Sequence, residues 1–415
     1  MRNRLYALLM TAMFLLVSIG INAYALSESS ILVDRQSTET LPAAYAPEDP
    51  VIHFPDPNFE KAVREQVFVP EGDIRASDVA NYRTLTVHES NIADLTGIEY
   101  FTALEELFCE ANQLTKLDVS HNTKLITLEC SDNQLTTLDV SQNTALKDLI
   151  CGRNQLTTLD VSHQPLLKTL ACEDNQLTTL DLSHNPALKD LVCGGNPLTT
   201  LDTSHNTKLV YISCANGQLT ALDLSRNPAL TELYCHANQL TELDVSHNPA
   251  LEFLICEGNQ LTTLDVGHNA TLVHLNCGSN QLTALDVSRN VMLGALECAG
   301  NQLTTLDVSQ NHELEELLCE DNQLTTLDVS QNLELRGLYC DGNQLSLLDV
   351  SQNAKLIELG CWNNHFPDKS AIIGLNEEQL EYFTFDTPED ANGYRSYMST
   401  MQAEAYYAAN PQEDW

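Results

Sequence analysis

The fold is decided by the stretch LITLECSDNQLTTLDVSQN, residues 125–143. It contains one short pattern twice, first as L-x-x-L-x-C-x-x-N and then as L-x-x-L-x-V-x-x-N. The stretch recurs along the chain every 21 residues, and a cysteine marks each copy. The 13 cysteines are Cys109, Cys130, Cys151, Cys172, Cys193, Cys214, Cys235, Cys256, Cys277, Cys298, Cys319, Cys340 and Cys361. Such a fixed period predicts a stacked solenoid and argues against several compact domains.

Each repeat contains two short extended segments, x-L-x-C-x and T-L-D-V-S. The alternation of apolar and polar residues turns Leu and Cys, or Leu and Val, toward the interior. We therefore predict a right-handed solenoid with parallel in-register sheets, about 4.8 Å between coils. A coil of this length has no room for a helix on its convex side, where we expect a second strand, a tight turn or polyproline-like chain.

The cysteine column has two possible interpretations. Thirteen thiols cannot all pair, and each takes an inward position that an aliphatic residue would otherwise fill. A buried thiol behaves as a small hydrophobe, so core packing is the favoured interpretation and a disulfide or metal ladder is the alternative. The columns that begin at Asn112 and Asn122 should satisfy backbone groups at the turns, because buried backbone must be paired.

The chain divides into five segments. Residues 1–25 have the pattern of a signal peptide, with two arginines, an apolar run and the cleavage motif Ala23-Tyr24-Ala25. The other segments are a flexible linker (26–50), a helical N-terminal cap (51–84), the repeats (85–366) and a C-terminal cap (367–415), with a short helix expected near Ser399 to Ala409. We expect a protein that is secreted or exposed at the cell surface, with no membrane span in the mature chain.

The formal net charge is −38. Such a chain repels phosphate backbones, which argues against nucleic acid and anionic membranes as partners and favours cationic partners or counterions.

Variation between the copies indicates the face that binds a partner. The residues beside each Leu-x-Cys differ from coil to coil, whereas the outward residues of T-L-D-V-S hardly change. Aromatic residues at outward strand positions are typical interface anchors. The predicted partner-binding residues are Phe108, Tyr211, Tyr234, His236, Phe253, Ile255, His274, Tyr339 and Trp362, with acidic residues as a polar rim. Scattered apolar side chains on an ordinary surface are the alternative explanation.

The second segment carries a complete column of aspartates from Asp118 to Asp349. Neighbouring carboxylates repel by roughly 1 kcal/mol even in water, so serine and threonine hydroxyls or cations must offset the charge. An adhesive or structural module that binds carbohydrate or divalent cations through this Asp/Thr/Ser side is thus the alternative function.

No motif for catalysis is present. The chain lacks a phosphate-binding loop, an H-E-x-x-H pair and a nucleophile motif. Many of the histidines, such as His121 and His163, occupy the variable S-x-N slot, where we expect them to face solvent. We predict no enzyme activity, no metal site and no cofactor.

The sequence resembles bacterial leucine-rich-repeat proteins of the internalin type. The resemblance is carried by residues 54–63 (FPDPNFEKAV) and 91–98 (NIADLTGI), which look like an internalin cap and first repeat, and it extends over residues 51–366. It implies a curved solenoid, α/β by family and mostly β here, that binds host or cell-surface proteins; we expect it to act as a monomer. The chain departs from the family in its 21-residue repeat, its core cysteines and its lack of a visible wall-attachment module.

Overall fold

A computed structural model describes residues 49–385. The predicted signal peptide, residues 26–48 of the linker and residues 386–415, with the helix expected near Ser399, lie outside the described residues.

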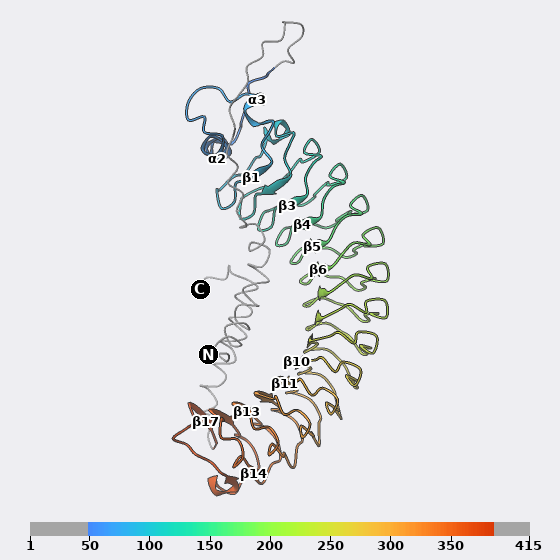
Figure 1. The fold of residues 1–415 in the computed structure, drawn as a ribbon, viewed down its shortest axis with the longest axis vertical. Helices are drawn as coiled ribbons and strands as arrows, with labels where there is room; N and C mark the ends of the chain where they lie inside the picture. The colour runs from blue at the N-terminus through green and yellow to red at the C-terminus, as the bar shows by residue number, and fades with distance from the viewer. Residues whose placement is uncertain (1–48, 386–415) are drawn as a thin grey trace. The chain divides into compact units, whose positions relative to one another are not determined.

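Residues 84–384 form a stack of coils joined by one parallel sheet of 15 strands (Figure 1). The strands follow each other in chain order, so every strand pairs with those of the coils before and after it. They are β1 (Thr84–Thr86), β2 (Glu106–Phe108), β3 (Thr127–Glu129), β4 (Asp148–Ile150), β5 (Thr169–Ala171), β6 (Asp190–Val192), β7 (Tyr211–Ser213), β8 (Glu232–Tyr234), β9 (Phe253–Ile255), β10 (His274–Asn276), β11 (Ala295–Glu297), β12 (Glu316–Leu318), β13 (Gly337–Tyr339), β15 (Glu358–Gly360) and β17 (Tyr382–Thr384). The predicted leucine-rich-repeat solenoid is confirmed.

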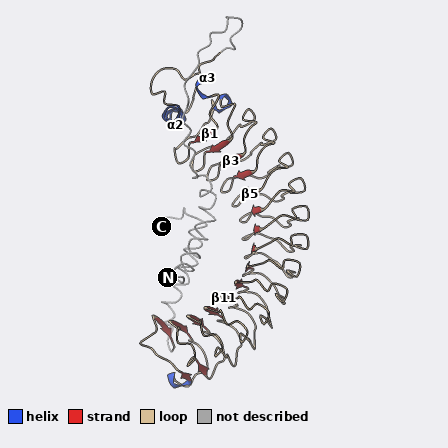
Figure 2. Ribbon diagram, in the orientation of Figure 1, coloured by secondary structure: helices blue, strands red, loops and turns tan. Residues whose placement is uncertain are grey.

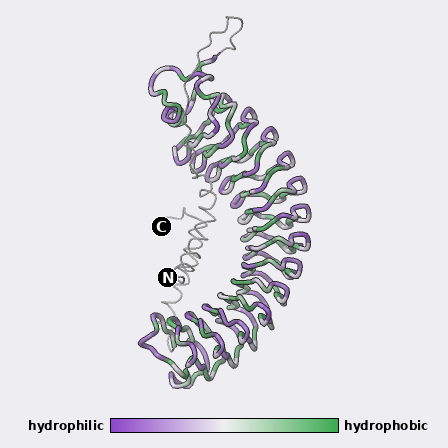
Figure 3. The backbone as a smooth tube through the Cα atoms, viewed as in Figure 1, coloured by the Kyte–Doolittle hydropathy of each residue, from purple (hydrophilic) through white to green (hydrophobic). Residues whose placement is uncertain are grey.

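The interior is built from columns of identical side chains. Each strand places its central residue, such as Leu107 or Leu128, in register above the next, and the cysteine that follows also points inward. All 13 cysteines are buried and free of disulfides. Figure 3 shows apolar segments along the body of each coil and hydrophilic residues at its turns. The strands lie toward the inner side of the arc that the coils follow (Figure 2).

The second segment, T-L-D-V-S, is a strand only at the C-terminal end of the stack. There β14 (Leu348–Asp349) pairs with β16 (Ile372–Ile373), and isolated bridges join Asp118 to Asp139 and Asp328 to Asp349. In every coil from Asp118 to Asp349, the aspartate Oδ1 accepts a hydrogen bond from the backbone N–H two residues later, as Asp139 does from Ser141 at 2.9 Å. The same bond is present at Asp349, which lies in β14, so it does not by itself prevent pairing between coils. The second sheet expected from the alternation is mostly absent from residues 49–385.

The turn after each cysteine requires a left-handed residue. The second residue after the cysteine has a positive φ, between 48° and 66°, in all 13 coils. Glycine and asparagine adopt this conformation at little cost. This explains the reversed order of Asn216 and Gly217: Asn216 takes the left-handed position (φ 54°), and Gly217 stands where other coils have the first column asparagine.

The first asparagine column closes these turns. In Asn133, Nδ2 donates to the carbonyls of Cys109 (3.0 Å), Cys130 (3.2 Å) and Ser131 (3.1 Å), and Oδ1 accepts from the N–H of Leu114 (2.9 Å). The side chain therefore joins two coils and satisfies four backbone groups, which confirms its structural role.

The second asparagine column makes fewer bonds. Asn143 donates through Nδ2 to the carbonyls of Val119 and Asn122, each at 3.0 Å, while its buried Oδ1 accepts no hydrogen bond. The same holds for most members of the column, from Asn122 to Asn353.

Short helical elements precede the stack. Helix α2 (Pro57–Val67) begins at Asp56, whose side chain caps the N–H groups of Asn58 and Phe59, and α3 spans Ala76–Val79. Two 3-10 helices, η1 (Ile98–Tyr100) and η2 (Lys369–Ala371), lie in the first and last coils. The roles of these end regions as caps stay predictions.

Candidate functional site

The strand face consists of the residues on either side of each central strand residue, together with the residue that follows each cysteine. Six of the predicted site residues meet on this face across β7–β10, and we call them the central surface: Tyr211, Tyr234, His236, Phe253, Ile255 and His274. The parallel register aligns Tyr211, Glu232, Phe253 and His274 in one row. It aligns Ser213, Tyr234, Ile255 and Asn276 in the next row.

Ring contacts connect the members of the central surface in pairs. The rings of Tyr211 and Tyr234 lie 5.5 Å apart in a tilted arrangement, and those of Phe253 and His274 lie 6.3 Å apart, edge to face. Tyr211, Tyr234 and Phe253 are each half-buried, so part of each residue is open to solvent. Apolar area is therefore offered to a partner on side chains that their neighbours already hold in place.

The acidic residues do not form only a rim. Glu232 lies in the same row as the aromatic residues, between Tyr211 and Phe253, and its Oε2 accepts a hydrogen bond of 3.2 Å from the Tyr234 hydroxyl. Burial and the nearby Glu232 carboxylate raise the pKa of Tyr234 far above its ordinary value, so this hydroxyl stays protonated.

A polar cluster continues the central surface at β10 and β11. Nε2 of His274, a residue only 9% exposed, lies 2.8 Å from Glu297 Oε1. Asn276 Nδ2 donates to Glu297 Oε2 at 2.8 Å and to Glu257 Oε2 at 3.2 Å. Burial lowers the pKa of His236, whose Nδ1 is buried without a hydrogen bond, so this ring is neutral at pH 7.

The other three predicted site residues lie elsewhere on the face. Phe108 belongs to β2, five strands from β7. Tyr339, in β13, is only 5% exposed, bonds through its hydroxyl to Glu358 and packs 6.1 Å from the ring of Tyr382. Trp362 follows β15 and is half-buried, and its backbone N–H donates a hydrogen bond to Asp341 Oδ1. These residues do not join the central surface, and the binding role of all nine stays a prediction.

Carboxylates of the strand face were missed as functional candidates. Burial raises the pKa of Glu173, Asp190, Glu232, Glu257 and Glu316. Their signal was present in the sequence, because they occupy the same variable columns as the aromatic residues.

Glu129 is a further carboxylate of the strand face whose pKa is raised. Burial, aided by Glu110 and Asp132, raises the pKa of Glu129 to about 7. In the same region Arg153 forms an ion pair with Asp132 at 2.5 Å and lies 3.9 Å from Glu173.

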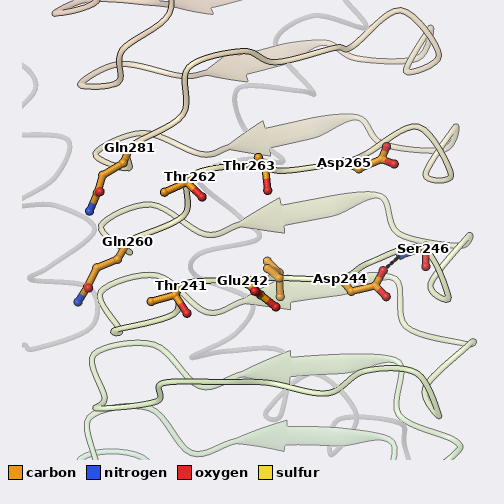
Figure 4. Close-up of a pocket in the computed structure, with 10 residues that line it drawn as sticks. Thr241, Glu242, Asp244, Ser246, Gln260, Thr262, Thr263, Asp265 and Gln281 are labelled. Atoms are coloured by element: carbon orange, nitrogen blue, oxygen red, sulfur yellow. Dashed lines mark hydrogen bonds between the residues drawn. The ribbon is translucent and has the colours of Figure 1, made fainter.

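The opposite side of the coils carries the aspartate column. Hydrogen bonds from the hydroxyl and N–H of the following serine lower the pKa of Asp160, Asp181 and Asp202, among others. A shallow depression of about 580 Å³ opens on this side between two neighbouring coils, lined mainly by polar groups including Thr241, Gln260, Thr262 and Gln281 (Figure 4).

The thiols of the cysteine column offer little reactive chemistry. Burial raises the pKa of the thiols from Cys109 to Cys340, which keeps them protonated and unreactive. Within residues 49–385, no group of three or more His, Cys, Asp or Glu side chains is placed to hold a metal ion. The same part of the chain contains no helix that is long and apolar enough to cross a membrane.

Comparison with known proteins agrees with this architecture. Residues 54–227 match the family model described as the leucine-rich-repeat domain of the endo-beta-N-acetylglucosaminidase EndoS. Internalin J of Listeria monocytogenes is 42% identical over 71 residues, a match that covers 17% of this chain and 8% of that protein.

Two solved structures from Listeria monocytogenes extend the likeness over most of the solenoid. The functional domain of InlJ, described as including a cysteine ladder, is 38% identical and superimposes with a TM-score of 0.77, over 80% of this chain and 74% of that one. The internalin InlF is 20% identical with a TM-score of 0.65, over 80% and 95% of the two chains, and it supports the fold alone. This chain therefore belongs to the internalin family of leucine-rich-repeat proteins, whose solenoid is a protein-interaction fold.

Proposed function

We propose that this chain is a non-catalytic, secreted or surface-exposed solenoid that binds a protein partner through the central surface. The observation that carries the proposal is the placement of Tyr211, Tyr234, Phe253 and Ile255 together on three adjacent strands, β7–β9, in the columns where the repeat varies. The apolar positions that build the core repeat almost unchanged, whereas these outward residues differ from coil to coil.

The geometry of the surface supports a binding role. Ring contacts hold the aromatic side chains, so little conformational entropy is lost when a partner covers them. Tyr and Phe in such positions are typical of residues that dominate binding energy. The partner is proposed to be a host or cell-surface protein, reached by export through the signal sequence in residues 1–25, and the solenoid is proposed to act as a monomer.

A capture experiment tests the proposal. The mature chain would be immobilised and exposed to extracts of cell-surface proteins, beside the variant Tyr234→Asp/Phe253→Asp. The matched control is Leu166→Asp/Met292→Asp, which alters two exposed apolar residues outside the central surface. We expect the first variant to lose its captured protein by at least tenfold and the control to retain it, with unchanged melting of both. Equal capture by all three chains would refute the central surface as the binding site.

A second candidate function is favoured by the depression on the aspartate side. Its hydroxyl and amide groups, on Thr241, Thr262 and Gln260, are of the kind that bind sugar hydroxyls. Thr241→Val/Thr262→Val should then abolish retention on a glycan array, while Thr136→Val/Thr157→Val, outside the depression, should not. An array on which the unaltered chain binds no glycan would eliminate this candidate.

A further inference from the structure

The strand face from β7 to β15 carries several carboxylates and no side chain of Lys or Arg. Across β7–β13 and β15, the two outward positions of each strand and the residue after each cysteine include no Lys or Arg. Seven carboxylates stand at these positions: Glu232, Glu257, Glu297, Glu316, Glu320, Asp341 and Glu358. The histidines there are His236 and His274.

Packing against the sheet makes this negative charge costly. Glu257 and Glu297 share the amide of Asn276, which brings their carboxylates to the same group. Burial raises the pKa of Glu232, Glu257 and Glu316, and the carboxylates of Glu297 and Glu358 add to the effect at Glu316. A cationic group docked on the face would relieve this repulsion.

The same positions in β2–β6 also include no Lys or Arg. There, however, Arg153, the second residue after Cys151, pairs with Asp132 and lies 3.9 Å from Glu173, so a cation of the chain itself lies beside the strand-face carboxylates. Arg336, in the C-terminal coils, lies before its strand and pairs with Glu315 rather than with the seven carboxylates.

We propose that the protein bound by the central surface presents a Lys- or Arg-rich segment with an apolar side chain. The apolar side chain packs on Tyr211, Tyr234 and Phe253, and the cations pair with Glu232, Glu257 and Glu316. This inference rests on the proposed function and adds the chemistry of the partner. Arginine suits the surface well, because its guanidinium both stacks on aromatic rings and pairs with carboxylates.

The test uses a defined probe and compares two faces of the same chain. The probe is a fluorescein-labelled 12-residue peptide of alternating lysine and tyrosine, and its counterpart replaces each lysine with glutamate. Glu232→Gln/Glu257→Gln/Glu316→Gln removes three charges from the strand face. Asp160→Asn/Asp181→Asn/Asp202→Asn removes three charges from the opposite side and keeps the amide oxygens that accept the serine N–H bonds.

We expect the lysine peptide to bind the mature chain in 0.15 M salt and the glutamate peptide not to bind. The strand-face variant should weaken lysine-peptide binding at least tenfold, and the opposite-side variant less than twofold, with both variants melting as the parent does. If both variants weakened lysine-peptide binding equally, the net charge of the chain would explain the effect and the proposal would be overturned. Unchanged binding by both variants would overturn it as well.

The outcome is separable from that of the capture experiment. If Tyr234→Asp/Phe253→Asp abolishes capture but the lysine peptide shows no preference for the strand face, the partner binds there without cationic chemistry. If the aromatic variant captures its protein normally, the proposed function itself fails.

Discussion

Thr203 shows how one residue can complete a repeating network. It occupies the inward position that is Val or Leu in the other coils, and its hydroxyl donates a hydrogen bond of 2.8 Å to Oδ1 of Asn227. Elsewhere the corresponding oxygen, as in Asn248 or Asn290, is buried without a donor. A buried carbonyl oxygen that lacks a partner costs about 1–3 kcal/mol.

Thr203→Val should therefore destabilise the protein by about 1–2 kcal/mol, because it leaves Asn227 like the other members of its column. Val266→Thr should be neutral or stabilising, since the new hydroxyl can reach Oδ1 of Asn290. Chemical denaturation measures both effects. Thr136→Val, at an exposed position, is the control and should change the free energy of unfolding by less than about 0.5 kcal/mol. A Val266→Thr variant destabilised by more than 1 kcal/mol, roughly the cost of an unpaired hydroxyl, would contradict this account.

Glu129 gives a pH-dependent prediction. Its pKa is raised from 4.5 to about 7 in the folded chain. A carboxyl with a raised folded-state pKa favours the folded state when protonated, so its contribution declines as the pH rises from about 4.5 to 7. Glu129→Gln should thus stabilise the protein at pH 8 by about 1–2 kcal/mol, after the discount for a partly solvated side chain. Unfolding curves at pH 4.5 and pH 8 measure the change, and a gain of the same size at both pH values would rule out the titration of Glu129 as its cause.

The two asparagine columns predict different costs within a single coil. Asn259 donates to three carbonyls and accepts from the N–H of Leu240, whereas Asn269 donates to two carbonyls and leaves its Oδ1 without a partner. We expect Asn259→Ala to destabilise by about 3 kcal/mol or more and Asn269→Ala by about half as much, because fewer backbone groups lose a partner. Denaturant titration of the two variants provides the comparison. Equal destabilisation by the two variants would show that the number of hydrogen bonds does not determine the stability of these turns.

Among the strands and turns, the sequence predicts the inward columns well and the structure of the T-L-D-V-S segment poorly. Leu128 and Cys130 face inward because alternation alone determines their side of a strand. Asp139 sits in an equally regular alternation, but its segment forms only an isolated bridge to Asp118 and no strand. The 21-residue spacing already places Glu232 between Tyr211 and Phe253, but it does not determine the diagonal ring contact of Tyr211 with Tyr234, which depends on side-chain conformation.

For the whole molecule, the chain-order sheet implies that coils contribute almost independently. Each strand pairs only with its two neighbours, so removing one complete coil restores the same contacts. Deletion of residues 298–318 should leave a folded protein whose melting temperature falls by a few degrees. Deletion of residues 298–317, one residue fewer, should prevent cooperative folding, because it shifts inward side chains to the outside. Size-exclusion chromatography and thermal melting distinguish these outcomes, and equal behaviour of the two deletions would argue against a strictly registered solenoid.

A protein partner that covers the strand face at β7–β10 should shield the aromatic rings of the central surface from solvent. Hydroxyl-radical footprinting of the mature chain, alone and with its captured partner, measures this because it reports solvent access one side chain at a time. We expect strong protection of Tyr211, Tyr234 and Phe253, and none of Leu166 or Met292. Protection of Leu166 or Met292 with the three aromatic rings still reactive would contradict this placement of the partner.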